Sequence, residues 1–447
     1  MQAVRWNATR WKPLFFTVWT GQMFSLLGSR LVQFALVWWL TQTTESGTVL
    51  AAATMAALLP QIVLGPFVGA LIDRWNRRWV MIIADSLIAL SIVGLALLFA
   101  SGRIAIWHVY VIMLIRSVGG TFHWGAMQAS TTLMVPAKHY SRVAGLNQAL
   151  QGAASIVAPA MGALLITLLP MQWVLSIDVL TAAVAVLPLL FIAIPQPEGA
   201  AVASGQPRPS VWEGVREGFR FFLGWRGMLY LMGIAAALNL LFAPASSLLP
   251  LLVLTRFGGE AYHFAALQMA LGLGVIAGGV LLGIWGGFRR RIVTSLVGIV
   301  GLGCAGLLLG LTPGTVFPLA VAAALLIGLM QPIANGPLLA VMQATVPPEM
   351  QGRVFSLLGS ASAAMMPIGL WIAGPLSDRF GAHVWYIAGG IAAIVLGVGA
   401  LFVRPIVTLE QHATSLQSDS SHGMSSQGGE SEIGLSSTSI QPEDVAD

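Results

Sequence analysis

Five ionisable side chains stand inside long apolar stretches of the sequence, where a charge is costly. They are Arg30, Asp85, Arg116, His123 and Asp178. A charged residue at the centre of a membrane helix costs about 2.5–3.5 kcal/mol on insertion scales, so each is a functional candidate. An apolar environment favours the protonated form of a carboxyl group, so Asp85 and Asp178 are the candidate proton carriers.

Each of these residues also has a structural interpretation. Arg116 either takes part in proton coupling or forms a structural ion pair with Asp85 on the neighbouring span. His123 follows Arg116 by seven residues, which places both on nearly the same helical face. A histidine there either titrates near neutral pH or is a hydrogen-bonded packing residue. Arg30 and Asp178 lie toward the outer ends of their spans, and they either pair or act separately.

The composition defines the elements that position these residues. The chain is 57% hydrophobic and only 9% charged, whereas a soluble domain has about 25% charged residues. We therefore predict an all-α integral membrane protein with twelve spans, each of the length that a membrane core requires. The expected spans are 14–40, 48–72, 79–100, 106–134, 143–169, 172–194, 228–254, 262–286, 292–312, 315–345, 354–377 and 384–403.

The spans divide into two groups of six. We expect an N-terminal half over 1–194, a cytoplasmic linker with an amphipathic surface helix over 195–227, and a C-terminal half over 228–405. Residues 406–447 are an acidic tail rich in Ser and Gly, and this composition is typical of disorder.

Loop charges predict the orientation. If alternate loops are assigned to opposite sides, seventeen of the 22 Lys and Arg residues fall on one side and three on the other. Cytoplasmic loops carry the excess of basic residues, so both termini are expected in the cytoplasm and the chain in the cell membrane. The lipid bilayer is then its constant partner, and we read the positive charge as orientation rather than nucleic-acid binding.

The loop after the second span is a candidate gate latch. Two glycines four residues apart would let another helix approach, and a carboxylate with three arginines would hold neighbouring helix ends together. A simple topology anchor is the alternative. These residues are Gly65, Gly69, Asp73, Arg74, Arg77 and Arg78. The stretch Gly374 to Gly381 echoes this pattern on the opposite side, and there it is a candidate helix cap and outer gate.

The two halves share landmarks. Val135 to Val143 aligns with Val346 to Val354 at an offset of 211 residues, so that Arg142 falls on Arg353. This repeat implies two halves related by a pseudo-two-fold axis along the membrane normal, with a substrate path between them.

These features together resemble the major facilitator superfamily, and within it the branch of macrolide-efflux and enterobactin-export proteins. The resemblance implies export of bulky amphipathic compounds, driven in many relatives by the proton gradient. Arg116 resembles the arginine of the fourth-span Arg-x3-Gly motif, which the family implicates in proton coupling. Pro159 and Gly162 match the fifth-span glycine–proline motif of drug/proton antiporters, whereas Ala154, Ala158 and Ala163 replace glycines; a plain proline kink is the alternative.

Polar and aromatic residues on several spans suggest a cavity for a large, partly apolar ligand. Taken singly, each is also compatible with core packing. The candidates are Gln22, Ser29, Arg30, Gln33, Trp124, Asn239, Gln331 and Asn335.

The sequence does not contain the motifs that are typical of several other function classes. The sequence has no Gly-x4-Gly-Lys-Ser/Thr loop, no nucleophile elbow and a single cysteine, Cys304. We expect no enzyme activity, cofactor or metal, and a monomer that binds a small-molecule substrate and protons. Uptake or uncoupled facilitation of a metabolite, and a non-transporting sensor or lipid-handling protein, are the alternatives to export.

Overall fold

The computed structural model describes residues 11–72, 74–196, 226–345, 348–403 and 405. This part of the chain is helical, with twelve long helices and one short 3-10 helix, η2, at Ala137–His139. The expected surface helix, most of the linker and the acidic tail lie outside the described residues. The boundaries predicted for those segments therefore stay predictions.

The first six long helices are antiparallel to their neighbours and joined by short turns. They are α1 (Trp11–Thr44), α2 (Gly47–Ile72), α3 (Arg77–Ala100), α4 (Ile106–Met134), α5 (Tyr140–Leu168) and α6 (Met171–Phe191). The second six are α8 (Arg226–Phe257), α9 (Ala261–Trp285), α10 (Arg291–Leu311), α11 (Phe317–Thr345), α12 (Pro348–Phe380) and α13 (Ala382–Phe402).

Ten of the helices in the described part of the chain are long and apolar enough to cross a membrane. The other two long helices, α4 and α12, have 29 and 33 residues. The helix bounds agree with the predicted spans to within a few residues, because a continuous apolar run is a strong signal. The chain is therefore a multi-pass membrane protein.

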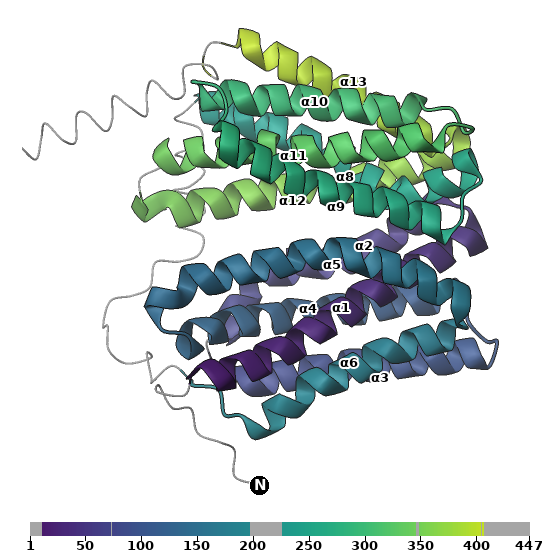
Figure 1. Ribbon diagram of the computed structural model, residues 1–447, viewed down its shortest axis with the longest axis vertical. Helices are drawn as coiled ribbons and strands as arrows, with labels where there is room; N and C mark the ends of the chain where they lie inside the picture. The colour runs from purple at the N-terminus through teal and green to yellow at the C-terminus, as the bar shows by residue number, and fades with distance from the viewer. Residues whose placement is uncertain (1–10, 73, 197–225, 346–347, 404, 406–447) are drawn as a thin grey trace, which may run out of the picture.

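The same packing pattern occurs in both halves. In the first half α1 packs on α5 and α6, α3 packs on α4 and α6, and α2 packs on α4. The corresponding pairs of the second half are α8 with α12 and α13, α10 with α11 and α13, and α9 with α11. Across the boundary α2 meets α12 and α5 meets α9, which are equivalent pairs under exchange of the halves (Figure 1). This confirms the predicted pseudo-two-fold fold.

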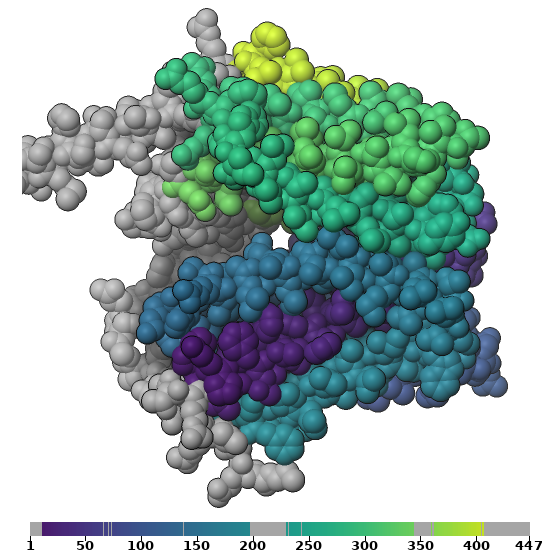
Figure 2. Space-filling view, viewed as in Figure 1, coloured from purple at the N-terminus to yellow at the C-terminus, as the bar shows by residue number. Residues whose placement is uncertain are grey.

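The halves are in contact at one end of the molecule and apart at the other. We call the end where α1 begins the amino end and the end where α1 finishes the far end. Figure 2 shows a hollow between the halves at the amino end. Near the far end, Phe264 of α9 stacks on Phe34 and Trp38 of α1, with ring centroids 4.9 and 5.8 Å apart.

The hydrophobic core has the same asymmetry. One cluster of buried side chains includes residues of both halves, such as Leu36, Trp38 and Leu252. Two further clusters belong to a single half each, one around Phe15 and Met81 and the other around Leu296, Ala334 and Ala393. Apolar packing therefore joins the halves only over part of their length.

Glycines allow the closest helix contacts. A Cβ atom on Gly278 of α9 would lie 2.1 Å from the backbone oxygen of Leu329 on α11. One on the adjacent Gly279 would have no atom within 4 Å. A comparison of alanine substitutions at Gly278 and Gly279 therefore distinguishes the effect of a close backbone contact from the effect of helix propensity.

We predict that Gly278→Ala destabilises the protein by about 1–3 kcal/mol, because the new methyl group must push α9 and α11 apart. Gly279→Ala is the control, and it should be neutral or slightly stabilising, since alanine favours helix. Gel filtration after heating in detergent measures the thermal midpoint of each variant. Equal midpoints for the two variants would contradict the close contact.

Candidate functional site

A buried ion pair connects three helices of the first half. The Arg116 guanidinium group on α4 donates to Asp178 Oδ2 on α6 at 2.5 Å and to the backbone oxygen of Ser29 on α1 at 3.0 Å. Ser29 Oγ donates to the other carboxylate oxygen at 2.9 Å. The side chains of Arg116 and Asp178 are only 11% and 2% exposed. Each charge is thus both buried and compensated.

Asp85 belongs to a second polar cluster beside the first. His123 Nε2 lies 2.7 Å from Gln22 Oε1 and 3.5 Å from Asp85 Oδ1, and Gln22 Nε2 lies 3.5 Å from Asp85 Oδ2. Asp85 is 5% exposed. The structural pair that the sequence suggested for Arg116, with Asp85, is therefore wrong: the arginine binds Asp178, and His123 is the ionisable neighbour of Asp85.

The two clusters border one cavity of about 290 Å³ within the first half. Its lining combines ionisable, amide and aromatic side chains. They include Gln22, Ser29, Gln33, Asp85, Arg116, His123 and Trp124. Trp124 is half exposed, so the indole lines the cavity without being buried.

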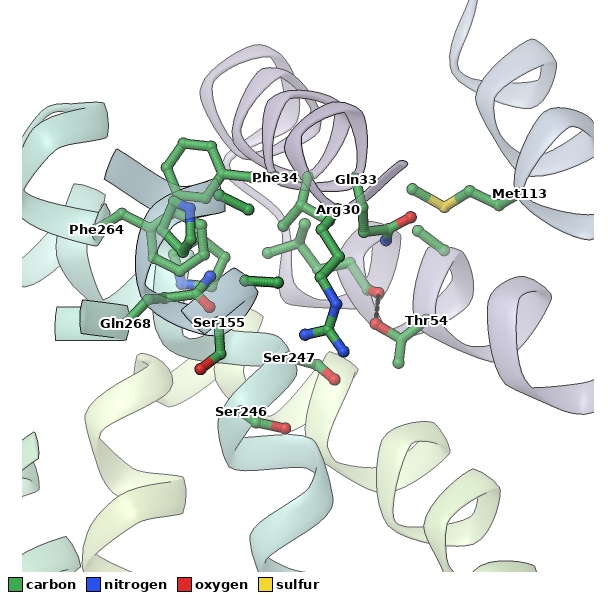
Figure 3. A pocket seen from close by; sticks show the side chains of 17 residues that line it. Arg30, Gln33, Phe34, Thr54, Met113, Ser155, Ser246, Ser247, Phe264 and Gln268 are labelled. Atoms are coloured by element: carbon green, nitrogen blue, oxygen red, sulfur yellow. Dashed lines mark hydrogen bonds between the residues drawn. The ribbon is translucent and has the colours of Figure 1, made fainter. Parts of the chain in front are cut away.

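Arg30 lies in a different cavity, between the halves. Its guanidinium group donates to Gln151 Oε1 on α5 at 2.5 Å, and not to Asp178. Figure 3 shows the group directed into a space bordered by Thr54 of α2 and by Ser246 and Ser247 of α8. This cavity has a volume of about 280 Å³, and the stacked rings of Phe34 and Phe264 form part of its wall. Arg30 and Asp178 are therefore not paired with each other in this structure.

The candidates from the second half line a third cavity. Asn239, Gln331 and Asn335 border a space of about 450 Å³ among α8, α10 and α11, and its other lining is mostly apolar. Asn239 Nδ2 also donates to the backbone oxygen of Ala235 on its own helix. The eight predicted substrate residues are therefore distributed over three cavities rather than one.

The basic loop residues bind helix ends of the first half. Arg77 donates to the backbone oxygen of Ala129 at 2.6 Å, at the end of α4, and Arg78 donates to the last carbonyl groups of α6. Arg74 is exposed, and Asp73 lies outside the described residues. A Cβ atom on Gly65 or Gly69 would meet nothing within 4 Å, so the expected close approach of another helix is absent here. The latch role itself stays a prediction.

Pro159 and Gly162 lie inside α5, where the helix passes α1. A Cβ atom on Gly162 would lie 2.7 Å from the ring of Phe34. Pro159 also lines the cavity between the halves. The motif therefore brings α5 against α1 at the wall of that cavity.

Asp378 near the end of α12 joins the halves at the far end. Its carboxylate accepts hydrogen bonds from the backbone nitrogens of Gly47 and Thr48, at 2.5 and 3.2 Å, and from the hydroxyl groups of Ser46 and Thr48. These donors form the N-terminus of α2, where a negative charge is favourable. The stretch that the sequence marked as an outer-gate candidate thus spans the boundary between the halves.

Three residues of the cavities were not found from the sequence. Gln151 binds Arg30, and Gln268 lines the same cavity. Ser295 lines the cavity of the second half, and its buried hydroxyl has no hydrogen-bond partner in the structure. An uncharged polar residue in an apolar run is a weak signal, because such residues also bond to their own helix. Within the described residues no group of His, Cys, Asp or Glu is arranged to hold a metal.

The fold and cavities define a class: a polytopic membrane protein of two repeated six-helix halves, with cavities inside each half and between them. A model of the Major Facilitator Superfamily matches residues 18–370. The chain belongs to this superfamily of membrane transporters.

Named relatives cover nearly the whole chain. Macrolide efflux protein A of Streptococcus pyogenes is 32% identical over 400 residues, which cover 90% of this chain and 98% of the relative. Multidrug efflux pump Tap of Mycolicibacterium fortuitum is 28% identical over 401 residues, covering 86% and 94%.

The fold is also found in solved structures. A bacterial homolog of the human lysosomal transporter Spinster, described as inward-facing and unoccupied, has a TM-score of 0.65 at 15% identity and covers 92% of this chain and 99% of that one. The D323A mutant of the nucleoside transporter NupG has a TM-score of 0.64 at 15% identity, with coverages of 86% and 99%.

We predict that Arg116→Gln and Asp178→Asn each destabilise the protein by about 3–5 kcal/mol, because each leaves one buried charge without its partner. The double variant should lose much less than the sum of the two. Thermal midpoints of the three variants in detergent measure this coupling, and Arg379→Gln at the exposed end of α12 is the control. Additive losses would show that the pair is not energetically coupled.

Proposed function

We propose that the protein is a secondary active exporter that moves bulky amphipathic small molecules across the cell membrane by alternating access, coupled to protons. The observation that carries the proposal is the pair of buried charged clusters beside the cavity of the first half. Charged groups at this depth are costly, and in transporters they mark ion pathways. The names of the relatives, macrolide and multidrug efflux pumps, support a drug-like ligand.

The asymmetry of the two ends supports alternating access. The halves pack together at the far end and leave a hollow at the amino end (Figure 2). The basic loop charges lie mainly at the amino end, so we assign that end, and with it both termini, to the cytoplasm. In this state a ligand would enter from the cytoplasm. Export then requires the far-end contacts to break and the amino ends to close.

The geometry favours Asp85 over Asp178 as the proton carrier. Both carboxylate oxygens of Asp178 are already engaged, one by the Arg116 guanidinium group at 2.5 Å and the other by Ser29 Oγ at 2.9 Å. The neighbours of Asp85 are an amide and a histidine, each at 3.5 Å. Gain of a proton by Asp85 would turn one of its oxygens from a hydrogen-bond acceptor into a donor and so rearrange the contacts with His123 and Gln22 that join α3 to α4 and α1. The ion pair of Arg116 and Asp178 then has a structural role and holds α1, α4 and α6 of the first half together.

One proton moving inward gains about 2.3 kcal/mol per 100 mV, which at 100 mV supports a concentration ratio of roughly fiftyfold. We predict that expression in an efflux-deficient host lowers the accumulation of at least one macrolide, dye or siderophore. An uncoupler should abolish the difference. Asp85→Asn should remove uncoupler-sensitive export while the protein still inserts, because an amide cannot carry the proton.

The matched control is Glu260→Gln, an exposed acid at the start of α9. Unchanged accumulation across the whole panel would argue against export, and a rise in accumulation would indicate uptake. Full uncoupler-sensitive export by the Asp85 variant would exclude this carboxylate as the proton carrier.

A second prediction concerns the far end. Asp378→Ala removes the acceptor for four hydrogen bonds across the halves. Asp378 is exposed, so we expect a net loss of only about 1 kcal/mol, equivalent to a several-fold population shift toward the state open at the far end. The readout is labelling of Ser247→Cys by an impermeant thiol reagent in a Cys304→Ser background, added from outside the cell.

Arg379→Ala is the matched control, since this side chain is adjacent to Asp378 and its guanidinium group lies over the Phe380 ring. Labelling should rise several-fold in the Asp378 variant and stay at the starting level in the control. The same labelling rate in both variants would mean that Asp378 does not hold the gate.

A further inference from the structure

We propose that the transported ligands include amphipathic anions: the acidic group of the ligand binds Arg30 between the halves, and its apolar body occupies the cavity of the second half. This inference rests on the proposed function, because it names the chemical class that the transporter binds. It is drawn from a charge without an acidic partner, a neutral polar lining and a neighbouring apolar space.

Arg30 differs from the other charged side chains at membrane depth. Arg116 and Asp178 compensate each other, and Asp85 lies against His123 and Gln22. In the described part of the chain, Arg30 has a single side-chain partner, the neutral amide oxygen of Gln151. An arginine stays protonated at all physiological pH values. The cavity between the halves therefore holds a permanent positive charge without a carboxylate.

The surroundings of Arg30 suit an anion. Among the described residues, no acidic side chain lines this cavity. Hydroxyl and amide groups line it instead, and Figure 3 shows them around the guanidinium group: Thr54, Ser155, Ser246, Ser247 and Gln268. A carboxylate or sulfonate could accept bonds from the guanidinium group, and the hydroxyl groups of Thr54 and Ser155, which donate to carbonyl groups of their own helices in this state, could turn toward it. A cationic group would meet like charge at the same place.

The space for the apolar body lies next to this polar site. Ser246 lines both the cavity of Arg30 and the 450 Å³ cavity of the second half. No charged side chain of the described residues lines the larger cavity, and its walls are mainly Leu, Ile and Ala. The buried hydroxyl group of Ser295 in that wall has no partner. Such a group costs free energy unless a ligand or water bonds to it.

The ligand class follows from the two cavities together. Apolar walls select an apolar ring system or chain, and the small number of polar groups fixes its orientation. The guanidinium group selects an acid at one end, because an anion removes the cost of an uncompensated charge at membrane depth. A neutral ligand of the same shape would gain only the apolar contacts.

The test compares two fluorescent probes that differ by one charged group. They are 8-anilino-1-naphthalenesulfonate and N-phenyl-1-naphthylamine, which has the same ring system without the sulfonate. Equilibrium binding to the purified full chain in nanodiscs is measured by fluorescence, with empty nanodiscs subtracted. Arg30→Gln should weaken sulfonate binding at least tenfold and change amine binding less than twofold. Arg30→Lys should keep most of the sulfonate affinity.

Two further variants test the apolar part. Ser295→Leu places a larger side chain in the cavity of the second half and should weaken both probes at least fivefold. Val297→Leu, on the exposed side of the same helix, is its control and should change neither probe. Arg103→Gln, in the exposed turn between α3 and α4, is the control for loss of a positive charge. Gel-filtration profiles verify that each variant is folded.

The inference is overturned if Arg30→Gln leaves sulfonate binding within twofold, or if it weakens both probes equally. Because equilibrium binding needs no proton gradient, its outcome is independent of the export assay. Sulfonate selectivity without uncoupler-sensitive export would support the anion site and reject the proposed coupling. Uncoupler-sensitive export without sulfonate selectivity would support the proposed coupling and reject the anion site.

Discussion

The interior of this protein depends on the cost of an unpaired charge in an apolar medium. Arg116 cannot lose its proton, so it must find an anion, and Asp178 on α6 supplies it. The same arginine also binds the backbone of Ser29, and Ser29 binds Asp178. Three helices, α1, α4 and α6, are thereby fixed around one charge. The remaining polar groups of the first half are arranged beside this tie.

The two halves share one packing pattern but differ in chemistry. The cavity of the first half contains Asp85, Arg116 and His123, whereas no charged side chain of the described residues lines that of the second half. The two halves of a repeated fold can therefore have different functions: one half binds protons, and the other binds the apolar surface of the ligand. Coupling then requires only that both cavities border the space between the halves. Gln33 and Ser246, which each line two cavities, lie at these borders.

The sequence was sufficient for the fold and for the depth of the charged residues. Long apolar runs, basic loops and repeated landmarks determine these features locally, and the helix bounds follow them closely. The partners could not be predicted in the same way. The structural alternative for Arg116 was an ion pair with Asp85, because α3 and α4 are adjacent, but the long arginine side chain reaches across the interior to Asp178 on α6. The neutral partner of Arg30, Gln151, leaves no local signal, because its role depends on how α5 crosses α1.

The contacts at the two ends differ in how easily they can be exchanged. Phe264 and Phe34 pack in a buried stack, whereas the hydrogen bonds of Asp378 are exposed to solvent. Exposed hydrogen bonds can be replaced by bonds to water, so breaking them costs little net free energy. Asp378 of α12 therefore holds the N-terminus of α2 at the far end, but the contact can still break when the protein changes state. A small difference between two states is what a transporter needs, because a single proton supplies only a few kcal/mol to move it.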